Sequence, residues 1–299
     1  MPHHHISLTM PVTLQAKNKG SFMKTMEFGE YSGKKVFYFH GVPGAVSEGA
    51  LFEKFAKQHQ LNIICMNRFS LHPALTGQAY YQQLASFMSE TAGTENMDIV
   101  GFSMGCQVAI ETSLLLGGKV NNLHLISAAA PLEAGNFLND MAGKPVFTLA
   151  KKLPAVFFLL THWQSLLAKL FPSLLFNLLF ASAQGEDKSL VKDDRFRQFI
   201  SPILKDCFSG HVKGYLRDIK HYVAPWQTSV PKCTTNTTVW HGEEDNWSPP
   251  AMAHYLKQAL PNCQKLELMA GLSHYSCLQA ASEKICRQLA QGNEQTLND

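Results

Sequence analysis

The sequence predicts an α/β protein in which a block of helices interrupts a parallel sheet. Up to Pro131, short apolar runs alternate with stretches of helical periodicity, as in strands joined by crossover helices. From there to about Lys232, helical periodicity continues without a convincing strand. Strand-like runs then return, so we expect the helical block to be an insertion within one sheet domain.

Apolar runs and helical spacing locate the individual elements. Strands are expected at 36–39, 61–66, 98–100, 123–127, 237–240 and 265–268. Helices are expected at 48–59, 76–91, 107–116, 249–260 and 282–291. The predicted organisation is a core domain made of residues 1–131 and 233–299 with an all-helical cap made of residues 132–232.

Composition excludes several classes of protein. Hydrophobic residues make up 45% of the chain and charged residues 16%, which favours a large buried core over disorder. The formal charge of +3 is small and the basic residues do not cluster, so no nucleic-acid partner is expected. The seven cysteines are scattered without a Cys-x-x-Cys pair, which indicates reduced thiols and no cysteine metal site.

Neither the N-terminal residues nor the most apolar segment predicts an exported or membrane-spanning chain. The start, Met1-Pro2-His3-His4-His5, lacks the basic and apolar regions of a signal peptide, so a cytoplasmic protein is expected. The apolar segment 145–181 is broken by lysines and prolines, whereas a span needs about 20 consecutive apolar residues. We expect two or three amphipathic helices there and no integral insertion.

The segment Gly101-Phe102-Ser103-Met104-Gly105 has the pattern Gly-x-Ser-x-Gly between a predicted strand and a predicted helix. A serine on such a sharp turn needs strained backbone angles, and the small flanking glycines, Gly101 and Gly105, avoid clashes there. The turn exposes the hydroxyl at the helix N-terminus, where amide groups can stabilise an oxyanion. Ser103 is therefore the candidate nucleophile.

A serine hydroxyl needs a base, and the base needs a carboxylate to fix its tautomer. His274 follows the last predicted strand, and Asp245 follows the strand before it, so both are expected at the carboxyl edge of the sheet. The order serine, acid, histidine is that of a known triad arrangement. Glu243, Glu244 and Glu133 remain alternative acids.

The segment His40-Gly41-Val42-Pro43-Gly44 follows the first strong strand. We expect the Val42 amide to be the second oxyanion donor, beside the Met104 amide, with Gly41 and Gly44 allowing close backbone approach. His40 is expected to be a structural turn residue. A metal site made by His40 and His241 would lack a third ligand, so no metal is expected.

Four segments resemble the motifs of the α/β-hydrolase fold superfamily: His40–Gly44, Gly101–Gly105, His241–Asp245 and Ser273-His274. They occur in the same order, over 36–131 and 237–291, and the helical block resembles the cap that many members insert. The resemblance implies a mostly parallel eight-stranded sheet flanked by helices. In the stretch where many members have an Asp-Arg-Pro-Gly-like segment, only Arg68 matches. Members with an aspartate nucleophile, the haloalkane dehalogenases and epoxide hydrolases, are excluded by Ser103.

The resemblance implies a serine hydrolase without a cofactor, acting on an ester-type bond (carboxylester, thioester or lactone) of a small apolar substrate. A C–C bond hydrolase and a non-catalytic ligand receptor are the alternatives. Large apolar residues crowd the segment between Phe147 and Phe180. We expect most of them to be buried within the cap or against the core. Apolar residues of this segment that are not buried in this way would line an apolar pocket over Ser103, or dock peripherally on a membrane.

Overall fold

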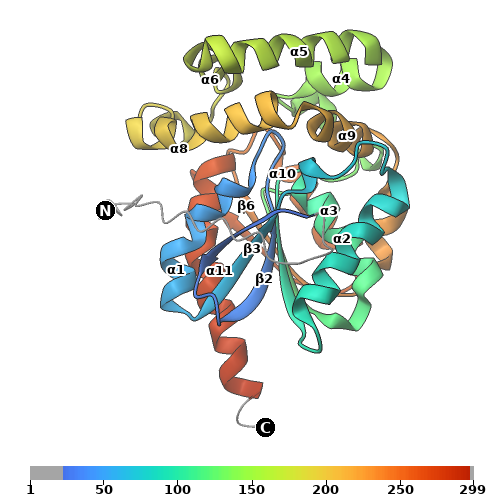
Figure 1. The fold of residues 1–299 in the computed structure, drawn as a ribbon, viewed down its shortest axis with the longest axis vertical. Helices are drawn as coiled ribbons and strands as arrows, with labels where there is room; N and C mark the ends of the chain where they lie inside the picture. The colour runs from blue at the N-terminus through green and yellow to red at the C-terminus, as the bar shows by residue number, and fades with distance from the viewer. Residues whose placement is uncertain (1–22, 297–299) are drawn as a thin grey trace.

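A computed structural model describes residues 23–296, which form the predicted α/β fold (Figure 1). The three N-terminal histidines lie outside the described residues. One sheet runs through the core in the strand order β1-β3-β2-β4-β5-β6-β7. All neighbouring pairs are parallel except β1 with β3. The predicted mostly parallel sheet is therefore confirmed.

The sheet has seven strands over the described residues, one fewer than the eight that the resemblance implied. They are β1 (Thr25–Gly29), β2 (Lys34–Phe39), β3 (Leu61–Met66), β4 (Met97–Phe102), β5 (Val120–Ile126), β6 (Asn236–Gly242) and β7 (Cys263–Met269). Six of them coincide with the predicted apolar runs. The sequence missed β1, because this antiparallel edge strand is only partly buried and mixes polar with apolar residues.

Helices cover both faces of the sheet. On one face lie α1 (Glu53–Gln58) and α11 (His274–Thr296), and on the other lie α2 (Gly77–Ala92) and α3 (Gly105–Leu116) (Figure 1). The helix α10 (Pro250–Ala259) packs on β6 and β7. The predicted last helix, 282–291, is much longer than expected, because α11 begins at His274 itself.

Every element between β5 and β6 is helical, and we call residues 132–232 the helical insertion. Its main helices are α4 (Lys144–Lys152), α5 (Pro154–Leu170), α6 (Pro172–Leu179), α7 (Asp187–Leu190), α8 (Asp194–Lys205) and α9 (Val212–Val223). Figure 1 shows two tiers: α8 and α9 lie next to the sheet, and α4, α5 and α6 lie outside them.

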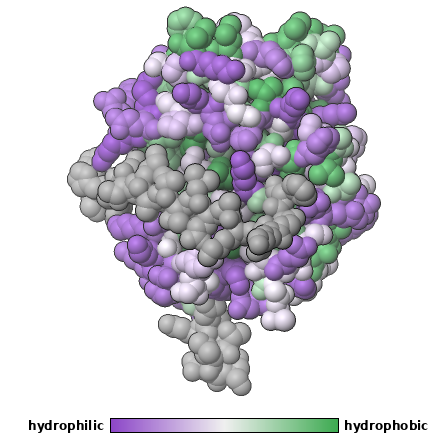
Figure 2. Space-filling model, in the orientation of Figure 1, coloured by the Kyte–Doolittle hydropathy of each residue, from purple (hydrophilic) through white to green (hydrophobic). Residues whose placement is uncertain are grey.

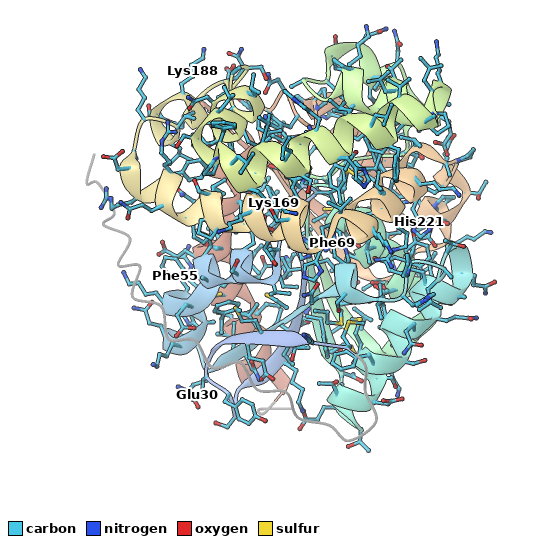
Figure 3. The ribbon with its side chains drawn as sticks, turned by 45° about the horizontal axis from the view of Figure 1, so that its top comes forward. Glu30, Phe55, Phe69, Lys169, Lys188 and His221 are labelled. Carbon is cyan, nitrogen blue, oxygen red and sulfur yellow. The ribbon has the colours of Figure 1, made fainter. Side chains whose placement is uncertain are left out.

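A buried ion pair joins the insertion to the core. The Arg68 Nε atom, in the turn after β3, lies 2.7 Å from an Asp218 carboxylate oxygen in α9, and both side chains are buried. Tyr80 donates a hydrogen bond to the same carboxylate, and Arg217 donates to the Arg68 carbonyl. Phe69, next to Arg68 and labelled in Figure 3, packs directly against α9 at Gly214.

The apolar residues of the outer tier are distributed differently from the prediction. Most of the large apolar side chains between Leu153 and Leu178 are exposed: Leu153, Val156, Phe158, Leu159, Trp163, Leu166, Leu170, Phe171, Leu174 and Leu178. The expectation that the insertion buries most of them is wrong, because α5 carries apolar residues at outward positions as well as on the side that meets other helices. Among residues 23–296, no helix has the length and hydropathy to cross a bilayer.

Replacing one partner of the buried ion pair tests how strongly it holds the insertion to the core. Asp218→Asn would leave the Arg68 charge buried without its counter-charge, so we expect a loss of about 3 kcal/mol in the free energy of unfolding by urea. The control is Asp193→Asn, which removes an exposed pair with Arg195 and should change stability little. Equal effects of the two substitutions would contradict this role.

Candidate active site

Ser103 occupies a sharp turn between β4 and α3, as its motif predicts. Its φ angle is +55°, in the left-handed region that non-glycine residues rarely adopt. Its amide donates to the Ile126 carbonyl at 2.9 Å, and its own carbonyl accepts from the Cys106 and Ala129 amides. These bonds to β5 and to the start of α3 hold the strained conformation in place.

Close backbone packing explains the glycines on either side of this turn. A side chain at Gly105 would collide with the carbonyl groups of Phe39 and His40 at the end of β2. A side chain at Gly101 would press on the Cα atom of Cys106. Both glycines therefore allow the start of α3 to approach β2 and β4 closely.

The loop after β2 lies directly against the serine. A Cβ atom on Gly41 would stand 3.0 Å from the Phe102 ring and 3.6 Å from the Ser103 Cβ atom. Gly41 thus lies next to Ser103, and Val42 is the residue that follows Gly41. Met104 is the N-cap residue of α3. Amides at the start of a helix have no acceptor within it, so the Met104 amide is suited to bind an anion.

The predicted acid and base form a buried hydrogen-bonded pair. His274 Nδ1 lies 2.8 Å from one carboxylate oxygen of Asp245. The other oxygen accepts hydrogen bonds from the Trp247 and Ser248 amides, both at 2.9 Å. The Trp247 ring stacks on the imidazole, with 5.5 Å between centroids. Asp245 and the Trp247 ring therefore fix the orientation of His274.

Two opposing effects determine the charge of Asp245. Burial alone would raise its pKa, but the charge and hydrogen bond of His274 oppose this, with further help from His241 and the Ser248 amide. The net result is a pKa below the ordinary value. Asp245 is thus a carboxylate at neutral pH, able to accept the Nδ1–H group of a neutral imidazole and to stabilise its cation.

The three alternative acids lie elsewhere. Glu243 and Glu244 are exposed beside Asp245. Glu133 accepts hydrogen bonds from the Trp226 and Gln227 amides, so it ties the start of the insertion to its end. Among these four carboxylates, only Asp245 is bonded to His274.

The serine and the histidine reach the same edge of the sheet from β4 and β7, which are separated by β5 and β6. The His274 ring lies 4.8 Å, between centroids, from the ring of Phe102, the residue before Ser103. Ser127, at the end of β5, donates a hydrogen bond to the His274 carbonyl at 3.1 Å. The Ser103 amide donates a hydrogen bond to the carbonyl of Ile126, the residue before Ser127. The carboxyl ends of β4, β5, β6 and β7 thus bring all three predicted triad residues to one edge.

Asp187, in α7 of the insertion, supports the histidine and was not found from the sequence. One of its carboxylate oxygens accepts from the Tyr275 amide, and the other accepts from the Ser276 amide and hydroxyl. These groups belong to the first turn of α11, so Asp187 caps the helix that begins at His274. No local pattern could reveal this, since the partners are nearly 90 residues apart.

Glu48 is the second buried carboxylate that sequence reasoning missed. One oxygen accepts hydrogen bonds from the Gly41 amide at 2.8 Å and from the Tyr38 hydroxyl at 2.7 Å. Burial raises the pKa of Glu48 from 4.5 to about 7, although these hydrogen bonds and the charge of Arg68 act in the opposite direction. Glu48 therefore holds the loop that carries Val42.

The two histidines considered for a metal make structural bonds instead. His40 Nδ1 lies 2.8 Å from the Gly41 carbonyl, and Gly44 packs against the same ring. Burial lowers the pKa of His40, and the positive charge of Arg68 lowers it further. His241 Nε2 lies 2.7 Å from the Ser248 carbonyl. Over residues 23–296 the structure shows no group of three or more ligating side chains suited to a metal ion.

The raised pKa of Glu48 predicts a pH-dependent stability. The folded state binds this proton more tightly than the unfolded state, so stability should fall as pH rises from about 4.5 to about 7. Glu48→Gln removes the titration but keeps a carbonyl oxygen for both donors. We expect urea unfolding to show a gain relative to the wild type that grows across this window by about 3 kcal/mol. Parallel profiles of the wild type and Glu48→Gln would refute this, and Glu90→Gln, on the exposed face of α2, is the control.

Comparisons with known proteins agree with this architecture. A model of the α/β-hydrolase fold family matches residues 36–281. Among solved structures, a candidate lipase from Acinetobacter baumannii is 15% identical with a TM-score of 0.68, over 96% of this chain and 93% of that one. A serine hydrolase from Cycloclasticus zankles is 16% identical with a TM-score of 0.64, over 96% and 99%.

An esterase from Exiguobacterium antarcticum is 17% identical with a TM-score of 0.59, over 90% of this chain and 94% of that one. At these identities the likeness to solved structures is one of fold alone. A search of curated proteins found no match. The family match spans most of the chain, and on that ground this protein belongs to the α/β-hydrolase fold family.

Proposed function

We propose that this α/β-hydrolase is a serine hydrolase that cleaves an ester-type bond of a small, apolar substrate through an acyl-enzyme. One observation carries the proposal: Ser103 sits on a left-handed turn beside the buried, hydrogen-bonded pair of Asp245 and His274. Similar solved structures include a serine hydrolase and an esterase, which favours an ester over other substrates. The bond is a carboxylester, a thioester or a lactone.

In the proposed reaction, the neutral His274 imidazole takes the Ser103 proton as the hydroxyl oxygen attacks the substrate carbonyl carbon. The carbonyl oxygen becomes an oxyanion, held by the Val42 and Met104 amides. The tetrahedral intermediate collapses as His274 gives the proton to the leaving oxygen or sulfur. Water, activated by His274, then attacks the acyl-enzyme, and the acid product leaves Ser103 free again. No cofactor takes part.

Asp245 has two parts in this scheme. Its hydrogen bond to Nδ1 keeps the proton of the neutral ring on that nitrogen, so Nε2 is unprotonated and can act as the base. Its negative charge then stabilises the imidazolium that forms after proton transfer. Glu48 contributes by holding the Gly41 amide, and so positions the oxyanion loop without touching the substrate.

Hydrolysis of nitrophenyl esters, from acetyl to long acyl chains, tests the nucleophile. Ser103→Ala removes the attacking oxygen, so we expect kcat to fall by about 10⁶-fold on any ester that the wild type cleaves. A preference for longer or aromatic acyl groups would support an apolar pocket. Activity that survives in Ser103→Ala would overturn the assignment.

Asp245→Asn tests the acid. The amide would keep the shape of the site but favour the wrong imidazole tautomer, so kcat should fall by about 10⁴-fold. Glu243→Gln and Glu244→Gln, on exposed side chains of the same loop, should leave kcat unchanged. If Glu244→Gln lowered kcat as much as Asp245→Asn, Asp245 would not be the acid.

Labelling with a fluorophosphonate distinguishes an unsuitable substrate from the absence of catalysis. A serine activated by His274 reacts with this probe, and the Ser103→Ala variant does not. Labelling without turnover of any ester would point to a C–C or other specialised bond. A folded protein that neither turns over esters nor reacts with the probe would be a ligand receptor.

A further inference from the structure

The outer tier of the insertion carries an apolar face that packs against nothing within residues 23–296. On α5, apolar residues recur every three or four positions on the outward side, which places them in one row along the helix: Val156, Leu159, Trp163, Leu166 and Leu170. Each is at least 45% exposed. This row lies opposite the buried residues of α5, among them Phe157, Thr161 and Leu167.

The row continues onto the neighbouring segments. Leu153 precedes α5, Phe158 flanks the row, and Phe171, Leu174 and Leu178 extend it along α6, all of them about half exposed. We call these ten residues the outer apolar face. Figure 2 shows hydrophobic residues gathered at the top of the molecule, over α4, α5 and α6 in the view of Figure 1.

The fold does not require this face. The outer tier already has an inner side, where α5 packs on α8 and α9, and α6 packs on α8. Exposed apolar patches of this extent mark sites of interaction with proteins or membranes. Only Tyr31, Leu115 and Leu268 are large, exposed apolar residues elsewhere in the described part of the chain, and they stand singly.

The charges within the segment that carries the face have a single sign. From 141 to 185 the sequence contains four lysines and no aspartate or glutamate. Lys151 and Lys152 end α4, just before α5 begins, and Lys169 stands near the end of α5 (labelled in Figure 3). All three are exposed, so they flank both ends of the apolar row of α5.

We propose that the outer apolar face docks on the surface of a bilayer that contains anionic lipids. A helix that is apolar on its outer side and flanked by lysines is suited to lie in the plane of the lipid headgroups. The lysines would meet the lipid phosphates, and the half-exposed Trp163 provides the ring type that is enriched at this depth. The protein would bind peripherally through the insertion.

A second copy of the chain fits the face less well. A two-fold contact brings the same surface of both subunits together. The lysines of one copy would then face those of the other, with no acidic residue in 141–185 to pair with them. An anionic surface matches the charge instead.

Co-sedimentation with lipid vesicles tests the proposal without relying on catalysis. The protein used carries Ser103→Ala, so that no lipid is consumed and a failure of the proposed function does not affect the result. We expect binding to vesicles of phosphatidylcholine mixed with phosphatidylglycerol, and weaker binding to phosphatidylcholine alone. Leu159→Glu, at the most exposed position of the row, should lower partitioning by about tenfold.

Matched variants separate the apolar and the charged contributions. Leu115→Glu places the same substitution at a 41% exposed leucine outside the insertion and should leave binding unchanged. Replacing Lys151, Lys152 and Lys169 by glutamine leaves every apolar contact intact. It should lower binding to the anionic vesicles by roughly fivefold per lysine and reduce their advantage over phosphatidylcholine.

Tryptophan fluorescence reports the depth of the face directly. Trp226 and Trp240 are buried and Trp247 is partly buried, so Trp163 is the exposed indole of the described residues. Anionic vesicles should shift the emission to the blue, and Trp163→Phe should abolish this shift while the protein still sediments with vesicles.

Two outcomes would overturn the proposal. One is a folded protein that does not sediment with anionic vesicles, or that sediments equally well with and without Leu159→Glu. The other is a dimer at micromolar concentration that Leu159→Glu dissociates, without vesicle binding, which would assign the face to a second copy of the chain.

Discussion

The left-handed backbone of Ser103 is the constraint on which the rest of the site depends. A non-glycine residue in this conformation costs on the order of 1–3 kcal/mol, which the surrounding hydrogen bonds and packing must offset. The Ser103 amide and carbonyl are both bonded to neighbouring segments. The turn lets α3 begin two residues after the serine, at Gly105, which packs closely against the Phe39 and His40 carbonyl groups at the end of β2. The backbone conformation of Ser103 therefore brings together the loop after β2, the start of α3 and the serine.

Buried carboxylates then connect the insertion to both sides of this site. Asp218 in α9 pairs with Arg68, whose guanidinium also lies 3.5 Å from the Gly41 carbonyl of the oxyanion loop. Asp187 in α7 caps the helix that carries His274. Side chains of the insertion therefore help to position the loop that contains Gly41 and the helix that begins at His274. A change in its packing would reach the site through these two contacts.

The inner and outer tiers of the insertion differ in how their apolar residues are distributed around the helices. The inner tier is amphipathic: the buried residues of α8 are apolar, and those of α9 are apolar apart from the ion-paired Arg217 and Asp218 and from Gly214. The outer tier breaks this rule in α5 and α6, whose outward positions are also apolar. Water would favour polar residues there, so the pattern is better explained by an apolar or interfacial environment.

The sequence by itself determined the α/β class and six of the seven strands, because periodicity and turn residues are local signals. It also placed Ser103, Asp245 and His274 after three different strands, and parallel strands end at one edge. It could not identify Asp187, Glu48 or Asp218, whose partners are distant in sequence and paired only by burial. Nor could it tell which side of α5 faces water, since apolar residues occupy both its inner and its outward positions. Tertiary packing decided both, because only the folded chain determines which polar groups lose water and must find partners.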